Sequence, residues 1–165
     1  QSIEHGLYVS EETFKLMAQK NIAYVPTLMV YEWWRDDKLF GTLSEKNKKK
    51  LTYTVDRHTE TFKRALKTKV KIVFGTDTFV LPGTNAYELD YMVQYGMKPI
   101  DVLKSATSAA AELLGISDIT GTIEKGKSAD LIAMEGDPSL DVKAVQNLSF
   151  VMKEGQIYLD KRNGK

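Results

Sequence analysis

The sequence predicts an α/β fold followed by a smaller β-rich region, and three patterns support this. Before Gly115, short apolar β-type runs alternate with segments of helical periodicity, which is the order of repeated β–α units. Val70–Phe74 is a β-branched apolar run flanked by helical patterns, as in a buried parallel strand. After Gly115, short β runs are separated by Gly, Asp and Pro turns. We therefore expect an α/β region over residues 1–115 and a β-rich region over residues 116–165.

The first part of the α/β region predicts two helices, one strand and one loop. Glu11–Lys20 has apolar residues at helical spacing behind a capping residue, Ser10. Ile22–Leu28 is a short apolar run broken by a proline, which favours a strand. Tyr31–Gly41 has no clear period, so we expect a loop. Ser44–Lys69 places apolar residues three and four positions apart, which predicts a long helix.

Further elements follow the strand expected at Val70–Phe74. Ala86–Tyr95 is predicted to be a helix, and another is expected from Pro99 to Leu114, because proline suits a first helical turn and Gly115 suits the end. Four β runs follow, the last two joined by a hairpin turn at Glu154-Gly155: Gly121–Gly126, Ala129–Met134, Leu148–Met152 and Gln156–Leu159.

The composition excludes several classes of protein and of site. The chain has 165 residues, of which 42% are hydrophobic and 27% charged, as in a globular domain and unlike a disordered or fibrous chain. A net charge of +1 gives no reason to expect a nucleic-acid or anionic-membrane partner. No apolar run approaches the ~18 residues of a membrane span. Since there is no cysteine, metal or acid–base chemistry must use carboxylates, hydroxyls, lysines or the two histidines, His5 and His58.

Two metal-competent side chains follow predicted strands. His5 ends the lead-in Ser2-Ile-Glu, and Asp77 follows Val70–Phe74 and a Gly-Thr pair. The active sites of β/α barrels lie at the carboxyl ends of their strands. An imidazole and a carboxylate are suitable ligands for Zn²⁺ or a similar divalent ion. His5 and Asp77 are therefore candidate metal ligands, although an aspartate after Gly-Thr can also simply cap a turn or the next helix.

Five motifs follow one another in order along nearly the whole chain. They are Ser2-Ile-Glu-His-Gly6, Tyr24-Val-Pro-Thr-Leu28, Val70 through Phe74-Gly-Thr-Asp77, Ala106-Thr-Ser-Ala-Ala-Ala-Glu-Leu-Leu-Gly115 and Gly121-Thr-Ile-Glu-Lys-Gly-Lys-Ser-Ala-Asp-Leu131. Together these motifs resemble the C-terminal portion of the amidohydrolase superfamily, in particular its imidazolonepropionase-like branch with Xaa-Pro dipeptidases and metallocarboxypeptidases.

The resemblance implies the C-terminal part of a (β/α)8 barrel plus C-terminal strands of a small β-sandwich built from both ends of the chain. It makes the residues near His5 the sixth barrel strand, Ile22–Leu28 the seventh and Val70–Asp77 the eighth. It further implies that His5 and Asp77 bind a divalent metal, usually zinc. Asp77 is then also the catalytic residue that accepts a proton from the attacking water.

The sequence departs from the family pattern in one large respect. The family's His-x-His pair, its carboxylated lysine and a further histidine belong to barrel strands that would precede Gln1. A catalytic zinc needs ~3 protein ligands and a water, whereas this chain offers two at most. We therefore expect the isolated chain to be inactive and to be a piece of a longer protein. Its expected partners are the remainder of the barrel or another copy of the chain, as in a homo-oligomer, and a small peptide or amide substrate.

Other residues have competing interpretations. His58 lies on the apolar stripe of the long helix, so we expect a structural histidine. Tyr31, Trp33 and Trp34 either line the substrate mouth or pack on a neighbouring helix or subunit. Thr27 lies at a strand end, where it either hydrogen-bonds to a metal ligand or, as the simpler reading, stabilises a turn.

Two classes of function remain open at this stage. The first is a metal-dependent hydrolase of a peptide or amide C–N bond, with cyclic-amide hydrolysis or deamination as rivals on the same scaffold. The second is a non-catalytic fragment or assembly module whose unpaired strand edges bind another chain.

Overall fold

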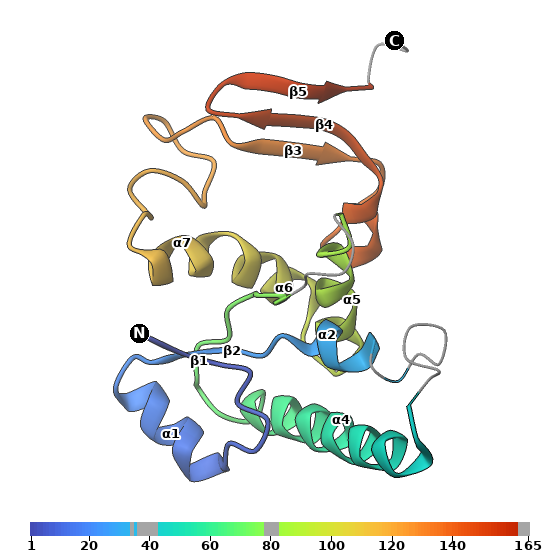
Figure 1. The fold of residues 1–165 in the computed structure, drawn as a ribbon. Coiled ribbons are helices and arrows are strands. Elements are labelled where there is room, and N and C mark those ends of the chain that lie inside the picture. Colours follow the sequence, from blue (N-terminus) through green and yellow to red (C-terminus); the bar gives the residue numbers. More distant parts are fainter. Residues whose placement is uncertain (34, 36–42, 78–82, 162–165) are drawn as a thin grey trace.

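The described part of the chain begins with alternating short strands and helices, continues with a series of helices and ends in a β-rich region. The structure is a computed structural model that describes residues 1–33, 35, 43–77 and 83–161 (Figure 1). The elements are β1 (Ser2–Glu4), α1 (Glu11–Gln19), β2 (Ala23–Val25), α2 (Leu28–Trp33), α4 (Glu45–Ala65), α5 (Ala86–Gln94), α6 (Pro99–Ala106), α7 (Ser108–Leu114), β3 (Leu131–Met134), the 3₁₀ helix η1 (Val142–Gln146), β4 (Leu148–Lys153) and β5 (Gln156–Asp160).

Three parallel segments form the sheet that positions the candidate site. β1 and β2 pair in parallel, and on the other side of β2 Tyr24 forms a single parallel bridge with Ile72. Two backbone hydrogen bonds support this bridge: Tyr24 N–H donates to the Lys71 carbonyl at 2.8 Å, and Val73 N–H donates to the Tyr24 carbonyl at 2.9 Å. The carboxyl ends of all three segments therefore lie at the same edge.

The parallel segments are shorter than the sequence predicts. The strand expected at Val70–Phe74 contributes one bridge and no regular strand, and the strand expected at Ile22–Leu28 is reduced to β2. The second shortening has a clear cause, because Leu28 already begins α2. The chain thus has the α/β class expected of it, whereas the numbering of these segments within a barrel remains a prediction.

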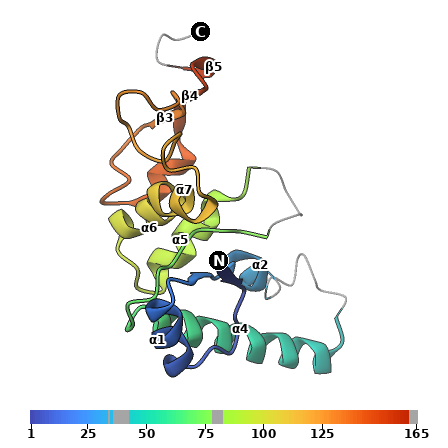
Figure 2. The ribbon, with the colours of Figure 1, turned by 90° about the vertical axis from the view of Figure 1, so that its left-hand side faces the viewer.

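One apolar core joins most of the helices to β2. α4 begins with Ser44, whose hydroxyl accepts from the Asn47 N–H at 3.4 Å, and it buries a stripe of residues at helical spacing. Fully burying a large apolar side chain contributes roughly 1.5–3 kcal/mol. In both ribbon views α1 and α4 lie at one end of the molecule and β3 to β5 at the other (Figures 1 and 2). The core cluster includes Phe14, Met17, Tyr24, Leu28, Phe62, Leu89, Met92, Val102 and Val142.

Three predictions about local structure are wrong. The loop expected at Tyr31–Gly41 begins inside α2; of that range, residues 34 and 36–41 lie outside the described residues. The helix expected from Pro99 to Leu114 divides at Thr107, whose φ of −125° and ψ of −94° are not helical. The strand expected at Gly121–Gly126 is absent, because its backbone turns back on itself and both of these glycines have a positive φ, 94° and 93°.

The β-rich region forms a three-stranded antiparallel sheet in the order β3-β4-β5. The hairpin turn expected at Glu154-Gly155 is confirmed: both residues have a positive φ, 51° and 80°, as tight two-residue hairpins require. The 3₁₀ helix η1 was not expected from the sequence, and its Val142 belongs to the same core as the α/β helices. The division at residue 115 therefore remains a prediction. Within the described part of the chain, no helix is both long and apolar enough to cross a membrane.

A buried carboxylate joins α5 to the start of α2. Glu88 has no solvent exposure, and its two oxygens accept hydrogen bonds from the Leu28 N–H at 2.8 Å and the Met29 N–H at 2.6 Å. Burial raises the pKa of Glu88 to about 8, although the two backbone donors oppose this shift. This contact explains why α2 forms where the sequence showed no helical period, since it satisfies N–H groups that a helix start leaves unpaired.

Gly75 is expected to tolerate no side chain while Val25 is present. A Cβ at Gly75 would lie 2.4 Å from Val25 Cγ1, so Gly75→Ala should destabilise the fold by about 1–3 kcal/mol in urea unfolding. The matched comparison is Gly75→Ala in a Val25→Ala background. There the added methyl group has room, so the loss of free energy of unfolding should be clearly smaller. An equal cost in both backgrounds would contradict the steric explanation.

The free energy of unfolding is expected to fall by roughly 1 kcal/mol per pH unit between about pH 6.5 and 8, because Glu88 stays protonated in the folded state and ionises on unfolding. Its folded pKa of about 8 exceeds the ordinary 4.5, so its contribution is complete below pH 4.5 and is lost as the pH rises through 8. His58 acts in the other direction: its pKa is lowered from 6.5 to about 4, so its contribution is complete above pH 6.5 and is lost on acidification. Urea unfolding of Glu88→Gln should therefore lose the slope above pH 6.5, and a profile parallel to that of the unsubstituted protein would refute the assignment.

Candidate metal and catalytic site

Three residues leave the parallel segments in the same backbone conformation. His5 follows β1, Thr27 follows β2 by two positions and Asp77 follows the segment that contains Ile72. Their φ angles are 61°, 53° and 49°, in the left-handed region that residues with a side chain rarely adopt. Such a backbone costs about 1–2 kcal/mol per residue. It persists only where surrounding contacts hold it, and it is most common at functional sites.

The structure brings His5, Thr27 and Asp77 together. His5 Nδ1 lies 2.8 Å from Thr27 Oγ1, and His5 Nε2 lies 4.0 Å from Asp77 Oδ2. The backbone of His5 is fixed as well, since its N–H donates to the Val25 carbonyl at 2.8 Å and its carbonyl accepts from the Tyr24 hydroxyl at 3.1 Å. The hydrogen bond at Nδ1 leaves Nε2 as the nitrogen that faces the carboxylate.

The pair formed by His5 and Asp77 fits part of a metal site. Two ligands that each lie about 2.0–2.2 Å from one zinc ion can be no more than about 4.4 Å apart, and the observed 4.0 Å is within that limit. Both side chains are open to solvent, with exposures of 40% and 59%. Among the described residues there is no group of three or more His, Cys, Asp or Glu that could hold a metal ion. Within the described part of the chain, His5 and Asp77 are therefore two candidate ligands at this place.

Tyr31 of α2 lies between the two histidines. Its ring meets His5 edge-on at a centroid distance of 6.3 Å and His58 at 4.7 Å. Burial and the nearby negative charge of Asp77 raise the pKa of Tyr31. Tyr31 also borders a cavity of about 490 Å³ that Leu7 and Leu51 help to line. Tyr31 thus packs on the neighbouring helix α4 and also lies beside His5, so both interpretations given for it stay open.

The other aromatic residues and His58 occupy structural positions. His58 is 1% exposed, and burial lowers its pKa to about 4, so it is neutral at pH 7 in the packing between α4 and α2. Its Nε2 has no hydrogen-bond partner among the described residues. Trp33 packs edge-on against Tyr87 of α5 at 6.3 Å, and Trp34 lies outside the described residues. Of the described residues of this aromatic cluster, Tyr31 thus lies beside His5 and Trp33 packs against α5.

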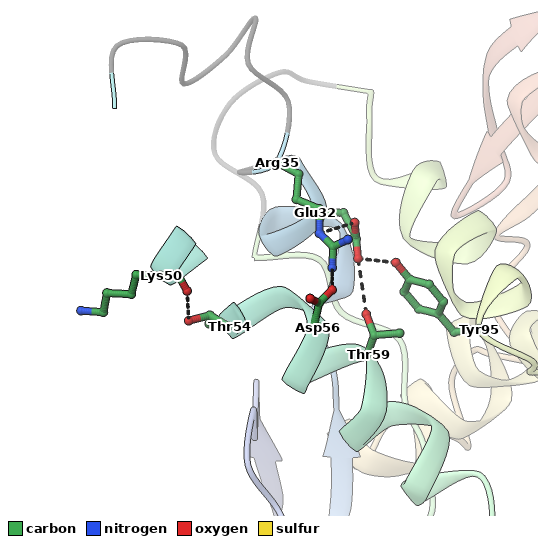
Figure 3. A network of polar contacts seen from close by, with 7 residues as sticks. All are labelled: Glu32, Arg35, Lys50, Thr54, Asp56, Thr59 and Tyr95. Carbon is green, nitrogen blue, oxygen red and sulfur yellow. Dashed lines mark hydrogen bonds and ion pairs between the residues drawn. The ribbon is translucent and has the colours of Figure 1, made fainter. Parts of the chain in front are cut away.

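A polar network fixes the carboxyl end of α2 (Figure 3). The Glu32 carboxylate accepts a short hydrogen bond from the Tyr95 hydroxyl and a longer one from Thr59 at 3.5 Å. It also pairs with Arg35 at 3.4 Å, and Arg35 pairs with Asp56 of α4 at 2.6 Å. Since Glu88 binds the other end, α2 is held at both ends by α5 and along its length by α4.

Of two further residues near the site, one had two interpretations and the other was missed. Thr27 was expected either to hydrogen-bond to a candidate ligand or, more simply, to stabilise a turn, and its hydroxyl contacts His5. Glu88 was not considered, although it stands directly before Leu89 and four residues before Met92, on the buried face of α5. A single acidic residue on an otherwise apolar helical face is the signal that could have identified it, because carboxylates are rarely buried without partners.

Comparison with known proteins agrees with this arrangement. The profile of the amidohydrolase family matches residues 1–159. The ochratoxinase of Aspergillus niger is 35% identical over 162 residues, which cover 95% of this chain and 33% of that protein. The crystal structure of a Xaa-Pro dipeptidase with bound methionine in its active site is 38% identical, with a TM-score of 0.88, over 96% of this chain and 40% of that one. A prolidase complexed with N-methylphosphonate-L-proline is 25% identical, with a TM-score of 0.83, over 98% of this chain and 40% of that one.

These matches extend over almost all of the chain and share its fold. The chain nevertheless spans only about a third of the length of the curated relatives it matches. Its α/β core and its antiparallel sheet match one segment of larger structures. This chain belongs to the amidohydrolase family.

Proposed function

We propose that this chain forms the carboxyl-terminal part of a metal-dependent hydrolase that cleaves a peptide or amide C–N bond. The observation that carries the proposal is the 4.0 Å approach of His5 Nε2 to Asp77 Oδ2 at the strand ends of an amidohydrolase. The names of the similar proteins, a Xaa-Pro dipeptidase and a prolidase, support a peptide-like substrate. Cyclic-amide hydrolysis and deamination are the competing reactions on this scaffold.

In this proposal His5 and Asp77 hold a divalent ion, most suitably zinc because the donors are an imidazole nitrogen and a carboxylate oxygen. When bound, the ion supplies a water whose pKa is lowered towards ~7. Asp77 is the catalytic base and accepts the proton of the attacking water, a role that its 59% exposure permits. Thr27 orients His5 through the hydrogen bond to Nδ1. Tyr31 and the adjoining cavity receive part of the substrate.

The site needs ligands beyond the two that the described residues supply. A catalytic zinc takes ~3 protein ligands, and His5 and Asp77 are two. We propose that the remainder of the barrel or another copy of the chain supplies the others, so that the isolated chain is inactive. Two observations support this: the chain covers 40% of the Xaa-Pro dipeptidase, and Ser2–Glu4 are exposed, with β1 paired only to β2 among the described strands. A homo-oligomer remains a prediction.

The proposal is tested on the complete natural protein by metal analysis and steady-state kinetics with a panel of dipeptides, N-acyl amino acids and cyclic amides. His5→Ala should lower the bound metal, because one ligand is lost. Asp77→Asn should lower kcat by about 10²–10⁴-fold, because an amide cannot accept the proton. The matched control is Asp101→Asn, a substitution at an exposed position of α6 that should preserve both metal and rate.

A complete protein that binds no divalent metal, or whose kcat is unaffected by Asp77→Asn, would overturn the proposal. A metal-free, inert protein that self-associates through β1 would instead favour the assembly module. The substrate panel separates peptide hydrolysis from the two competing reactions, because the same site residues would serve all of them.

A further inference from the structure

We propose that Glu88 is a positioning residue for His5, acting through the first residues of α2 and through Thr27. The inference rests on the proposed function, because it assumes that His5 is a metal ligand. Glu88 belongs to α5 and does not touch His5 itself. Three consecutive links connect Glu88 to His5: hydrogen bonds to the first residues of α2, the peptide bond between Thr27 and Leu28, and the hydrogen bond between Thr27 and His5.

The first contact joins Glu88 to α2. Oε1 accepts from the Leu28 N–H at 2.8 Å and Oε2 from the Met29 N–H at 2.6 Å. These are the first two residues of α2, whose N–H groups have no acceptor within the helix. All three residues are buried, with exposures of 0%, 1% and 0%, so water cannot replace the carboxylate. The place where α2 starts is therefore set by Glu88.

The second contact is covalent, since Thr27 directly precedes Leu28. Thr27 has a φ of 53° and is 3% exposed. A β-branched residue in the left-handed region is unusual and must be held by its surroundings. The peptide that follows Thr27 carries the N–H bound by Glu88 Oε1, so the carboxylate fixes the chain on the carboxyl side of the strained residue.

The third contact joins Thr27 to His5. The Thr27 hydroxyl lies 2.8 Å from His5 Nδ1, while Nε2 faces Asp77. A histidine that binds a metal through one ring nitrogen normally has its other nitrogen held by a neighbouring group, and losing that group lowers metal affinity about 10–100-fold. Here the neighbouring group is a hydroxyl. The carboxyl group of Glu88, which fixes the position of Thr27, is one contact further from His5.

The test is a double-mutant cycle on zinc affinity, measured by competition with a chromophoric chelator in the complete natural protein. Glu88→Gln replaces one of the two acceptors with an amide NH₂ group, and Thr27→Val removes the hydroxyl. Each should weaken zinc binding by about 10-fold or more. Because both act through the same contact, the double variant should be no weaker than Thr27→Val alone. Thr27→Ser, which keeps the hydroxyl, should restore most of the affinity.

Tyr95→Phe is the matched control, because it loosens the opposite end of α2 by removing the Tyr95–Glu32 hydrogen bond. A zinc affinity of Tyr95→Phe within twofold of that of the unsubstituted protein supports the inference. An equal loss in Tyr95→Phe and Glu88→Gln, or losses that add in the double variant, would show a general loosening of α2 and overturn it. If Glu88→Gln does not fold, Glu88→Asp takes its place in the cycle, with the same outcomes.

Failure of this inference can be told apart from failure of the proposed function. If the unsubstituted protein binds zinc and the Glu88 and Thr27 variants bind it equally well, only the positioning role is wrong. If the unsubstituted protein binds no metal, the proposed function is wrong. In that case the tautomer of His5, read from ¹⁵N spectra of the metal-free protein, still decides the positioning role: Glu88→Gln should change the proportion of the Nδ1–H form, and an unchanged spectrum refutes it.

Discussion

The parallel register around β2 is the constraint on which the candidate site depends. Residues 2–4 pair with one side of β2, and Ile72 bridges to the other side at Tyr24. Because all three segments run in the same direction, the residues that follow them emerge at one edge. His5 and Asp77 are far apart in the sequence, yet this pairing brings their side chains to 4.0 Å. An antiparallel arrangement would place them at opposite ends of the sheet.

So short a sheet cannot hold these ends by itself. β1 and β2 have three residues each, and three residues beyond the segments adopt a strained left-handed backbone. The helices supply the missing constraint. α5 is central, since Glu88 holds the start of α2 and the Tyr95 hydroxyl, one residue past α5, holds Glu32 near its end. The helices thus bury the core and also fix the backbone from which Thr27 reaches His5.

Local patterns predicted the parts of the fold that depend on local contacts. Ser10 was recognisable as a cap, the apolar stripe of α4 was readable, and Glu154-Gly155 was recognisable as a turn. His5 and Asp77 could be chosen as neighbours because each follows an apolar run. The family resemblance gave their proposed roles, which the sequence patterns could not supply.

The error at α2 has a physical cause that no local pattern contains, which is contact between residues distant in sequence. α2 forms because Glu88, 60 residues after Leu28, satisfies its first N–H group. No window around Tyr31 contains that information. At Thr107 the helix breaks although the alanine-rich sequence around it favours a continuous helix. In residues 121–126 the composition suited a strand, but the two glycines adopt a positive φ and the backbone turns.

The two acidic residues and the two histidines of this region differ in the same property, which is their exposure to solvent. Asp77 and His5 are 59% and 40% exposed, whereas Glu88 and His58 are buried. A group that exchanges a proton with water or binds an ion must be reachable from solvent. A group that holds backbone or fills a packing position must be shielded, because water would compete for its partners. Burial accordingly raises the pKa of Glu88 to about 8 and lowers that of His58 to about 4, which keeps both neutral around pH 7 and unsuited to carry charge at the reaction centre. Asp77 and His5 therefore serve the proposed chemistry at the edge of the sheet, while Glu88 and His58 stabilise the surrounding structure. Solvent access distinguishes the two roles.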